Sequence, residues 1–536
     1  MARKTPVLVL LSLALTTTAL FSAPADKDGY LSVPGHPATL GEDPTQIAAR
    51  QALDAQWLFD RRALTTRAPG IVVSLTDQDR IDIGMTDDKN ATADDLRVRK
   101  MRVGVVKNIQ GVNFRGVTPE QVTAGDVFAG GQLAATGDGF TWTLIAESPD
   151  ALGMRVNFDR FSLPAGAEMW VYGENDEAFG PFTGFGRHDD GEFWAELIHT
   201  SRAYVQLHYK GEMDPRSLNE IRFDVPAVAI LAVSDAAGTA TRAICGNASC
   251  INTSNSGASA TQKAAAGHMR WVSGAFLNIC SGALIADTDN SSERPLFLTA
   301  NHCVSRGKDA RNLQVYFNYT SGCSPSGNST SGSQILSSSG NGDHTLLELN
   351  QNPPGGTSFL GWSNVPIASN NNASMERISH PNAQSQSFSA HSVDSGSFTC
   401  NGFPRGEFIY SRDTNGATDG GSSGGPVVNG GGLIVGQLFG ACGSNLGDVC
   451  DVNNNRTMDG ALAHYYSSVS TYLDPDGGGD PPGGDCDNDN VCEPGEDCTN
   501  CGDCAGRQNG RPANRYCCGD GTEQNAETSA LCDGNF

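Results

Sequence analysis

The middle of the chain contains the stretch Asp419-Gly420-Gly421-Ser422-Ser423-Gly424-Gly425-Pro426-Val427-Val428. Glycines surround the two serines, and an apolar segment begins at Pro426. A glycine leaves neighbouring backbone N–H groups unobstructed, which suits donors that must reach a negatively charged oxygen. A serine in a loop of this composition is usually a solvated turn residue. Ser423 is therefore a candidate nucleophile only if a base and a carboxylate accompany it.

Two upstream segments supply such groups. An apolar strand runs into a histidine at Phe297-Leu298-Thr299-Ala300-Asn301-His302-Cys303, and an aspartate enters a second apolar strand at Gly342-Asp343-His344-Thr345-Leu346-Leu347-Glu348-Leu349. A serine hydroxyl needs an adjacent base to take its proton, and the base needs a carboxylate to fix its tautomer. The chain provides these groups in the order His302, Asp343, Ser423, which is the order in double-barrel proteases.

These residues carry a family resemblance. Thr299-Ala300-Asn301-His302-Cys303 with Gly421-Ser422-Ser423-Gly424-Gly425-Pro426 resembles the chymotrypsin/trypsin family of serine endopeptidases. The segments Asp343–Leu349 and Gly436-Gln437-Leu438 resemble the bacterial lysyl-endopeptidase branch, and the similarity covers roughly residues 243–472. The resemblance implies an all-β fold with a chymotrypsin-like double β-barrel protease domain.

The resemblance also implies a role for each site residue. His302 is the expected general base, Asp343 orients it, and Ser423 is the expected nucleophile. The backbone N–H groups of Gly421 and Ser423 are the expected oxyanion hole. These roles imply peptide-bond hydrolysis through an acyl-enzyme intermediate, with protein or peptide substrates.

The substrate pocket is less clear from the sequence. Ala417 occupies the place of the acid that lies six residues before the nucleophile in trypsin-type enzymes. Lysyl endopeptidases use an acid three residues before a glycine on a late strand, and taking Gly460 as that glycine gives Thr457. Other alignments place one of three acids in the pocket: Asp459, Asp451 or Asp448. A buried charge would select Lys or Arg at P1, the substrate residue before the cleaved bond, whereas an uncharged pocket favours small or apolar side chains. Both preferences stay open.

The sixteen cysteines divide the chain. None precedes Cys245, eight lie between Cys245 and Cys450, and eight lie between Cys486 and Cys532. An even number in an oxidising compartment favours disulfides over free thiols. The lysyl-endopeptidase resemblance implies the pairs Cys245–Cys442, Cys250–Cys323 and Cys280–Cys303, and it leaves Cys400–Cys450 as the fourth.

The chain begins like an exported protein. Arg3 and Lys4 precede an apolar run from Val7 to Leu15, and Ala23-Pro24-Ala25 offers small residues before a cleavage site. This layout predicts a signal peptide at residues 1–25 rather than a membrane anchor, which would need about 20 apolar residues. The mature protein is expected to be secreted, with no membrane association after the signal is removed.

Residues 26–242 are predicted to be a propeptide. A surface helix is expected around Gln46–Leu53, and period-two segments from Phe140 onward predict an antiparallel β-sandwich in the second half. A double barrel depends on non-local strand pairing and folds slowly, so this region is expected to act as a folding aid and an inhibitor of its own enzyme. The alternative is an accessory sandwich retained in the mature protein.

The rest of the domain plan follows from composition. The protease domain is expected at residues 243–475, a Gly/Pro linker at 476–484, and an acidic Cys-rich module at 485–536. Disulfides are favoured over zinc in this module because it contains no histidine. Its acids could bind calcium, although their spacing does not match an EF-hand. No other metal or cofactor is expected.

Charge limits the partners. The 60 acidic and 36 basic residues give a formal net charge of −24, so there is no basic stripe for nucleic acid. The chain is expected to be a monomer. The leading interpretation is a secreted serine endopeptidase made as an inactive preproenzyme. The alternative is a catalytically inactive relative that binds a partner through its Cys-rich tail.

Ser422, the residue before the expected nucleophile, leads to a testable prediction. Trypsin-type enzymes place an aspartate there to capture the ammonium of the new N-terminus, whereas this chain has Ser422. Blocking the α-amine of the processed protein should leave the rate of peptide hydrolysis unchanged, because no carboxylate stands in position to pair with it. Complete loss of turnover after blocking would contradict this expectation.

Overall fold

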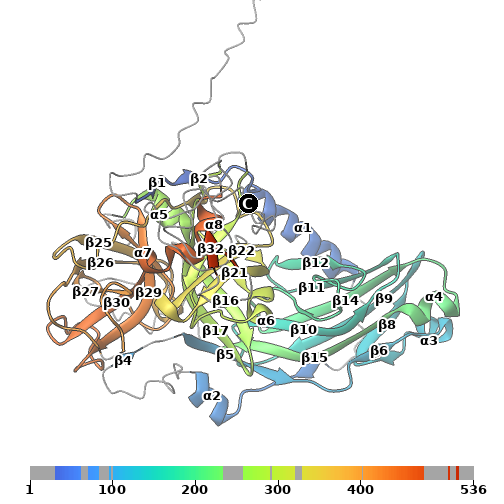
Figure 1. Ribbon diagram of the computed structural model, residues 1–536. Coiled ribbons are helices and arrows are strands. Elements are labelled where there is room, and N and C mark those ends of the chain that lie inside the picture. Colours follow the sequence, from blue (N-terminus) through green and yellow to red (C-terminus); the bar gives the residue numbers. More distant parts are fainter. Residues whose placement is uncertain are drawn as a thin grey trace, which may run out of the picture.

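The computed structural model describes residues 30–61, 70–83, 100–232, 258–289, 292–319, 329–400 and 402–475, together with the backbone of short strands at 96–97, 505–507 and 515–517. Figure 1 shows an elongated β-rich region on one side, coloured cyan to green, and a second body coloured yellow to orange. The sequence prediction of an all-β fold is confirmed.

In the described residues, the N-terminal region contains nineteen helices and strands. In chain order they are β1 Ser32–Val33, β2 His36–Pro37, α1 Pro44–Arg61, β3 Ile71–Val72, α2 Asp77–Ile83, β4 Leu96–Arg97, β5 Met101–Asn108, β6 Asn113–Arg115, α3 Pro119–Ala124, β7 Val127–Phe128, β8 Gly131–Ala135, β9 Gly139–Glu147, β10 Gly153–Ser162, β11 Ala167–Tyr172, β12 Ala178–Phe182, β13 Phe193–Trp194, β14 Arg202–Lys210, α4 Pro215–Glu220 and β15 Arg222–Leu231. The helix expected near Gln46–Leu53 and the strands expected from Phe140 onward are present as α1, β9, β10, β11 and β14.

Two sheets of this region pack face to face. One has the order β12-β11-β14-β9-β8-β7, and the other contains β13-β10-β15-β5 with β6 beside β15. Aromatic side chains from both sheets fill the space between them, including Phe114, Trp142 and Phe223. Alternation places these rings on the inner faces, which explains why a period-two pattern predicts a sandwich here.

The middle of the chain supplies the remaining elements. They are α5 Ala260–Ala265, β16 Ala266–Ser273, β17 Phe276–Leu284, β18 Leu296–Ala300, α6 Gly307–Arg311, β19 Gln314–Phe317, β20 Ser329–Ser331, β21 Ser333–Ser339, η2 Asn341–Asp343, β22 His344–Leu349, β23 Ser358–Phe359, β24 Trp362–Ser363, β25 Ser374–Ser379, η3 Pro381–Ala383, β26 Ser387–Val393, β27 Phe408–Asn415, β28 Pro426–Asn429, β29 Ile434–Gly443, β30 Asn455–Ala461, α7 Leu462–Tyr465, η4 Tyr466–Ser468 and α8 Ser470–Leu473. Two further strands, β31 Ala505–Arg507 and β32 Arg515–Cys517, pair with each other.

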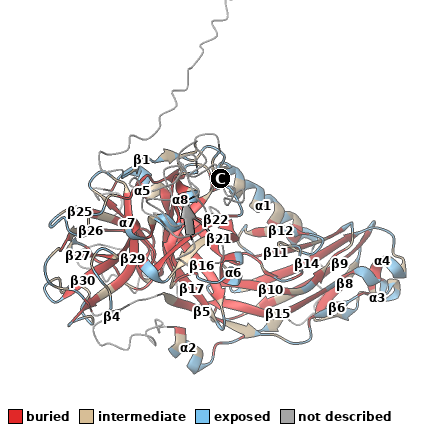
Figure 2. Cartoon of the chain, viewed as in Figure 1, coloured by how far each residue is buried: buried red, intermediate tan, exposed pale blue. Residues whose placement is uncertain are grey.

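These strands form two barrels. In the first, β19, β16, β17, β18, β22 and β21 follow one another in hydrogen-bonded order around a core that contains Trp271 and Phe297. In the second, the order β29-β28-β25-β26-β27-β30 closes on itself because β30 also pairs with β29. Figure 2 shows that the strands of both barrels are largely buried, whereas helices such as α2 and α4 are more exposed. The double-barrel prediction is confirmed.

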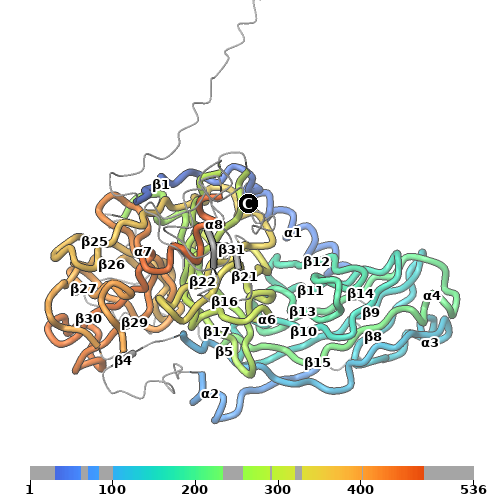
Figure 3. Tube along the Cα trace, in the orientation of Figure 1, coloured from blue at the N-terminus to red at the C-terminus, as the bar shows by residue number. Residues whose placement is uncertain are grey.

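The N-terminal region is joined to the first barrel by a continuous sheet. Strand β5 pairs with β15 of the sandwich on one edge and with β17 of the barrel on the other. The short strands β1 and β2 add to β24 and β23. Figure 3 shows β5 passing beneath the first barrel from the sandwich side. The sequence gives no hint of this shared sheet, because pairing partners more than 100 residues apart leave no local pattern.

Some expectations fall outside the described residues. These are the signal peptide, the cleavage region near residue 242, the linker, and the disulfide and calcium predictions for the Cys-rich module. Within the described part of the chain, no helix has both the length and the apolar character needed to cross a membrane.

A buried ion pair lies inside the second barrel. The guanidinium of Arg377 contacts the carboxylate of Asp459, and both side chains are fully buried. Burial lowers the pKa of Arg377, and burial raises the pKa of Asp459 although Arg377 opposes that rise. Arg377 also donates from Nε to the carbonyl of Gly425, 3.1 Å away, so the pair ties β25 to the glycine loop.

Arg377→Met should reduce the free energy of unfolding by roughly 3–5 kcal/mol, because it leaves a buried carboxylate unpaired. The measurement is urea unfolding in a Ser423→Ala background. Arg412→Met is the control, since Arg412 is half exposed in its contact with Asp394 and should cost about 1 kcal/mol or less. Equal losses in the two variants would contradict the prediction.

Candidate active site

A histidine and an aspartate meet in the first barrel. His302 follows β18, and its Nδ1 lies 2.7 Å from Oδ2 of Asp343. The backbone N–H of His302 donates to Oδ1 of the same carboxylate at 2.9 Å. The carboxylate thus fixes both the ring and the backbone of the histidine. Nε2 of His302 is buried and has no hydrogen-bond partner among the described residues, so the second ring nitrogen is left for another group.

The position of Asp343 depends on the second barrel. Its φ is +50°, a left-handed conformation that non-glycine residues rarely adopt. Gln437 of β29 donates from Nε2 to the carbonyls of Gly342 and Asp343, at 2.9 and 3.0 Å. A Cβ at Gly460 would lie 1.9 Å from the carbonyl oxygen of Gly342. Gln437 and Gly460 are therefore positioning residues, and no sequence pattern indicates their contacts with this turn.

The loop that carries Ser423 packs against the strands leading to His302. Ser281 of β17 donates its N–H to the carbonyl of Ser423 at 2.8 Å. A Cβ at Gly424 would lie 2.2 Å from Oγ1 of Thr299 and 2.8 Å from the nitrogen of Ala300. Only glycine fits this approach, which also has a positive φ of 77°. The structure thus brings the Ser423 loop to the end of β18, two residues before His302.

The peptide group between Gly420 and Gly421 has a fixed orientation. Asn382 donates its N–H to the carbonyl of Gly420 at 2.6 Å. Because the peptide is planar, the N–H of Gly421 points away from that carbonyl. Gly421 has φ of +93°, and a Cβ there would lie 2.7 Å from the carbonyl of His380. This geometry suits a backbone donor held in place before any ligand arrives.

The disulfides agree with the expectation only in part. Cys280–Cys303 is present and fixes the residue after His302 to β17. Cys400 is bonded to Cys442, so the expected pairs Cys400–Cys450 and Cys245–Cys442 are both wrong. Cys442 lies on β29, and Cys400, whose N–H donates to Oη of Tyr410 at 3.1 Å, joins it in one apolar cluster with Phe408, Tyr410 and Phe439. Cys450 is bonded to another partner, and Cys245, Cys250 and Cys323 lie outside the described residues.

A group of possible metal ligands lies beside the site. Cys280, His302 and Cys303 come within 4.8 Å of one another. The two cysteines form a disulfide and offer no thiolate, so this donor set does not suit a metal ion.

A pocket opens beside Ser423 in the second barrel. Its wall includes Leu438, Gly440 and Ala441 of β29, and its acids are Asp413 and Asp419. Asp413 lies at the end of β27, where Oδ1 accepts from Oγ1 of Thr457 and from Nδ1 of His391, both at 2.8 Å. Asp419 accepts from the backbone N–H of Gly420 at 2.8 Å.

The pocket corrects several sequence predictions. Thr457 does line it, and its hydroxyl orients Asp413. Asp459 is not a pocket acid, because it is fully buried against Arg377. Ala417, Asp448 and Asp451 are absent from the described lining, and the latter two accept backbone N–H groups in a turn. Asp413 was missed because an aspartate at a strand end looks like turn chemistry in the sequence.

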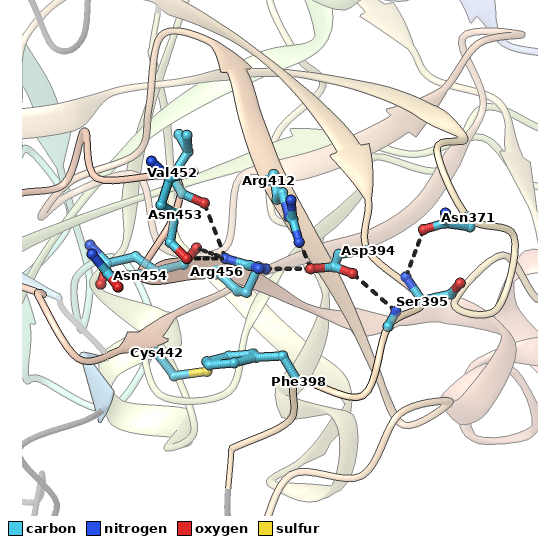
Figure 4. A network of polar contacts seen from close by, with 12 residues as sticks. Asn371, Asp394, Ser395, Phe398, Arg412, Cys442, Val452, Asn453, Asn454 and Arg456 are labelled. Carbon is cyan, nitrogen blue, oxygen red and sulfur yellow. Dashed lines mark hydrogen bonds and ion pairs between the residues drawn. The ribbon is translucent and has the colours of Figure 1, made fainter.

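A polar network supports one wall of the pocket. Arg456, which lines the pocket, contacts Oδ2 of Asp394 and donates to the carbonyl of Val452 at 3.1 Å (Figure 4). Arg412 reaches the same carboxylate oxygen at 3.0 Å. Burial would raise the pKa of Asp394, but hydrogen bonds from Arg456, Gly396 and Arg412 outweigh it and lower the pKa to about 2. Asp394 therefore holds the guanidinium of Arg456, and it shares its single negative charge with Arg412.

Comparison with known proteins agrees with this geometry. Residues 241–458 match the family model described as lysyl endopeptidase, C-terminal domain. A lysyl endopeptidase of Pseudomonas aeruginosa is 28% identical over 306 residues, which cover 53% of this chain and 63% of the relative. Residues 241–458 are therefore similar to the C-terminal domain of lysyl endopeptidases.

Solved protease structures are more distant. The active form of the Rv3671c protease from M. tuberculosis matches 42% of this chain and 86% of its own, with 16% identity and a TM-score of 0.27. The HtrA-type protease AlgW with a tripeptide matches 40% of this chain and 61% of its own, with 15% identity and a TM-score of 0.29. The similarity to lysyl endopeptidases rests on the sequence matches, and the match to the P. aeruginosa enzyme spans less than two thirds of that relative.

Proposed function

We propose that this protein is a secreted serine endopeptidase made as an inactive preproenzyme. The observation that carries the proposal is the His302–Asp343 pair, whose second imidazole nitrogen is buried and unpartnered among the described residues, beside the Ser423 loop. Two other described histidines, His199 and His391, also contact a carboxylate through Nδ1, but their Nε2 atoms contact Arg270 and Ser389. The family match over residues 241–458 supports the same assignment.

In the proposed mechanism, Ser423 attacks the scissile carbonyl while His302 takes its proton. Asp343 holds the imidazole in the tautomer that has its free lone pair on Nε2 and stabilises the imidazolium that forms. His302 then gives the proton to the leaving amine. Water hydrolyses the acyl-enzyme in a second round of the same proton transfers.

The tetrahedral intermediate needs donors for its oxyanion. We assign the backbone N–H groups of Gly421 and Ser423 to this role. The anchored carbonyl of Gly420 supports the assignment, because a donor held before the reaction costs no reorganisation when charge develops. Removing one such donor typically costs about 10²–10³ in kcat.

The pocket favours a basic P1 residue. Asp413 and Asp419 line it, and the arginine in its described lining is paired with Asp394. Asp413 has its carboxylate oriented by Thr457 and His391, which prepares it to accept an ammonium or guanidinium. Of the two preferences that the sequence left open, Lys or Arg is therefore the one proposed.

The remaining parts of the proposal rest on the sequence. The signal-like segment at residues 1–25 and the disulfides support secretion. Residues 26–242 are proposed to act as a propeptide that aids folding and inhibits the enzyme, which works as a monomer on proteins or peptides. The competing function is an inactive binding protein that uses the Cys-rich tail.

A fluorophosphonate probe separates these two functions. The full chain, incubated until its fragment pattern is constant, should be labelled, and Ser423→Ala should abolish the label because the attacked oxygen is gone. Ser422→Ala is the matched control, since its buried hydroxyl accepts from the N–H of Asp419 at 3.3 Å, and it should retain the label. A folded wild-type chain that takes no label would support the binding protein instead.

Peptide substrates that differ only at P1 test the pocket. Asp413→Asn should lower kcat/KM for Lys and Arg by roughly 10²–10³, the range expected when a desolvated charge loses its partner. Ala and Phe substrates should change little. Asp448→Asn removes a nearby turn acid and serves as the control. A wild-type preference for Ala or Phe, or an equal loss for all four substrates, would refute the role of Asp413.

A further inference from the structure

Ser281 of β17 contacts the nucleophile loop twice, once through its backbone and once through its side chain. Its N–H donates to the carbonyl of Ser423 at 2.8 Å, and its hydroxyl donates to the carbonyl of Gly421 at 2.8 Å. Ser281 is fully buried, so bulk water does not compete for either contact. One residue of the first barrel therefore holds the carbonyls on both sides of the peptide group that joins Ser422 to Ser423.

The second barrel fixes the direction of the Ser281 hydroxyl. The backbone N–H of His380, which follows β25, donates to Oγ of Ser281 at 2.9 Å. A backbone N–H can only donate and a carbonyl can only accept, so the single hydrogen of the hydroxyl points to Gly421. The carbonyl of Ser281 accepts from Oγ1 of Thr299 at 2.9 Å, which holds β17 at the same point.

These contacts complete a set of anchors along the loop. The carbonyl of Gly420 accepts from the N–H of Asn382 at 2.6 Å, and the carbonyl of Ser422 accepts from the N–H of Gly425 at 2.9 Å. Together with the two contacts of Ser281, all four carbonyls from Gly420 to Ser423 are held. Among these four printed contacts in the described residues, three donors are backbone N–H groups and the fourth is the Ser281 hydroxyl.

The directions of these carbonyls set the directions of the oxyanion donors. In a planar trans peptide, the N–H points away from the carbonyl of the same peptide group. Anchoring the carbonyls of Gly420 and Ser422 therefore aims the N–H groups of Gly421 and Ser423 to the opposite side. The peptide group between Gly421 and Ser422 lies between these two donors, so its rotation would change their orientation relative to each other.

Gly421 gives this middle peptide group little restraint of its own. Its φ is +93°, and a Cβ there would lie 2.7 Å from the carbonyl oxygen of His380 and 2.9 Å from Cδ1 of Ile279. Glycine is thus required at this position, yet glycine has the backbone that rotates most freely. The Ser281 hydroxyl supplies a restraint that no side chain at position 421 can supply.

We propose that Ser281 is a positioning residue of the oxyanion hole, whose hydroxyl holds the carbonyl of Gly421 and thereby keeps the N–H groups of Gly421 and Ser423 aligned on the developing oxyanion. The inference rests on the proposed function, which assigns these two donors. Donors that are aligned before the reaction stabilise the transition state more than the bound substrate. The hydroxyl should therefore affect kcat rather than KM.

Ser281→Ala tests this role in the full chain, with Ser333→Ala as the matched control. Ser333 is also a buried serine of the first barrel, and its hydroxyl donates to the carbonyl of Ala310 at 2.9 Å. Rates are divided by the concentration of sites that take the fluorophosphonate label at completion, so that an unfolded fraction does not lower them. Ser281→Ala should reduce kcat by roughly 10-fold to 100-fold at unchanged KM, because the donors remain but lose their alignment. Ser333→Ala should keep both constants.

A peptide trifluoromethyl ketone gives a readout that a purely structural role would not change. The Ser423 oxygen bonds to its carbonyl carbon, the serine proton passes to His302, and the carbonyl oxygen becomes the negative oxygen of a hemiketal. In Ser281→Ala the inhibition constant of this ketone should rise by the same factor by which kcat/KM falls, because both depend on the oxyanion donors. In Ser333→Ala the inhibition constant should stay the same.

A second pair of variants repeats the comparison with a different side-chain shape. Ser281→Thr and Ser281→Val introduce side chains of nearly equal shape, of which only threonine carries a hydroxyl. The threonine variant should have a kcat at least tenfold higher than the valine variant. This pair decides the matter if Ser281→Ala does not fold.

The possible results separate the role of Ser281 from the proposed function. An active wild type in which Ser281→Ala matches Ser333→Ala in kcat per labelled site would refute the role of Ser281 and leave the proposed function intact. A loss of kcat without a change in the inhibition constant, or equal kcat in the threonine and valine variants, would do the same. A wild-type chain that takes no label would refute the proposed function, and the inference with it.

Discussion

The carbonyl of Gly342 is the point at which the two barrels determine each other's geometry. It belongs to the turn of the first barrel that presents Asp343, yet it lies against Gly460 of β30 and accepts from Gln437 of β29. Asp343 has a left-handed backbone, which costs energy unless surrounding contacts impose it. A side chain at Gly460 would push this turn away, and the carboxylate would lose both of its contacts with His302.

The pocket of the second barrel also depends on contacts between residues that are far apart in the sequence. Its buried Arg377–Asp459 pair holds β25 and β30 together, while Arg377 also reaches the carbonyl of Gly425 in the nucleophile loop. The ion pair keeps Asp459 out of the pocket and leaves Asp413 as the acid that Thr457 orients. Two aspartates less than fifty residues apart thus have different roles, because one is enclosed with an arginine and the other faces the pocket.

The N-terminal region contacts the first barrel through shared strands and also through side chains, for example Arg155 with the carbonyl of Asn312 and His199 with Arg270. β5 is shared between the sandwich and the first barrel, and β4 adds to the second. β5 lies along β17, a central strand of a barrel whose own pairings are non-local.

Local sequence patterns are enough to predict many of the strands and the chemical groups of the site. Alternation predicted the sandwich strands, and the motifs around His302, Asp343 and Ser423 indicated a serine protease domain, because local patterns record which faces are buried and which residue types a reaction needs. Contacts between distant residues become visible in the three-dimensional fold. It paired Cys400 with Cys442, placed Asp413 rather than Asp459 in the pocket, used Gln437 and Gly460 to hold Asp343, and brought β4 onto β29. Each of these contacts joins segments that are far apart in the sequence, and no local pattern links them. Burial and strand pairing decide which of the possible partners come together.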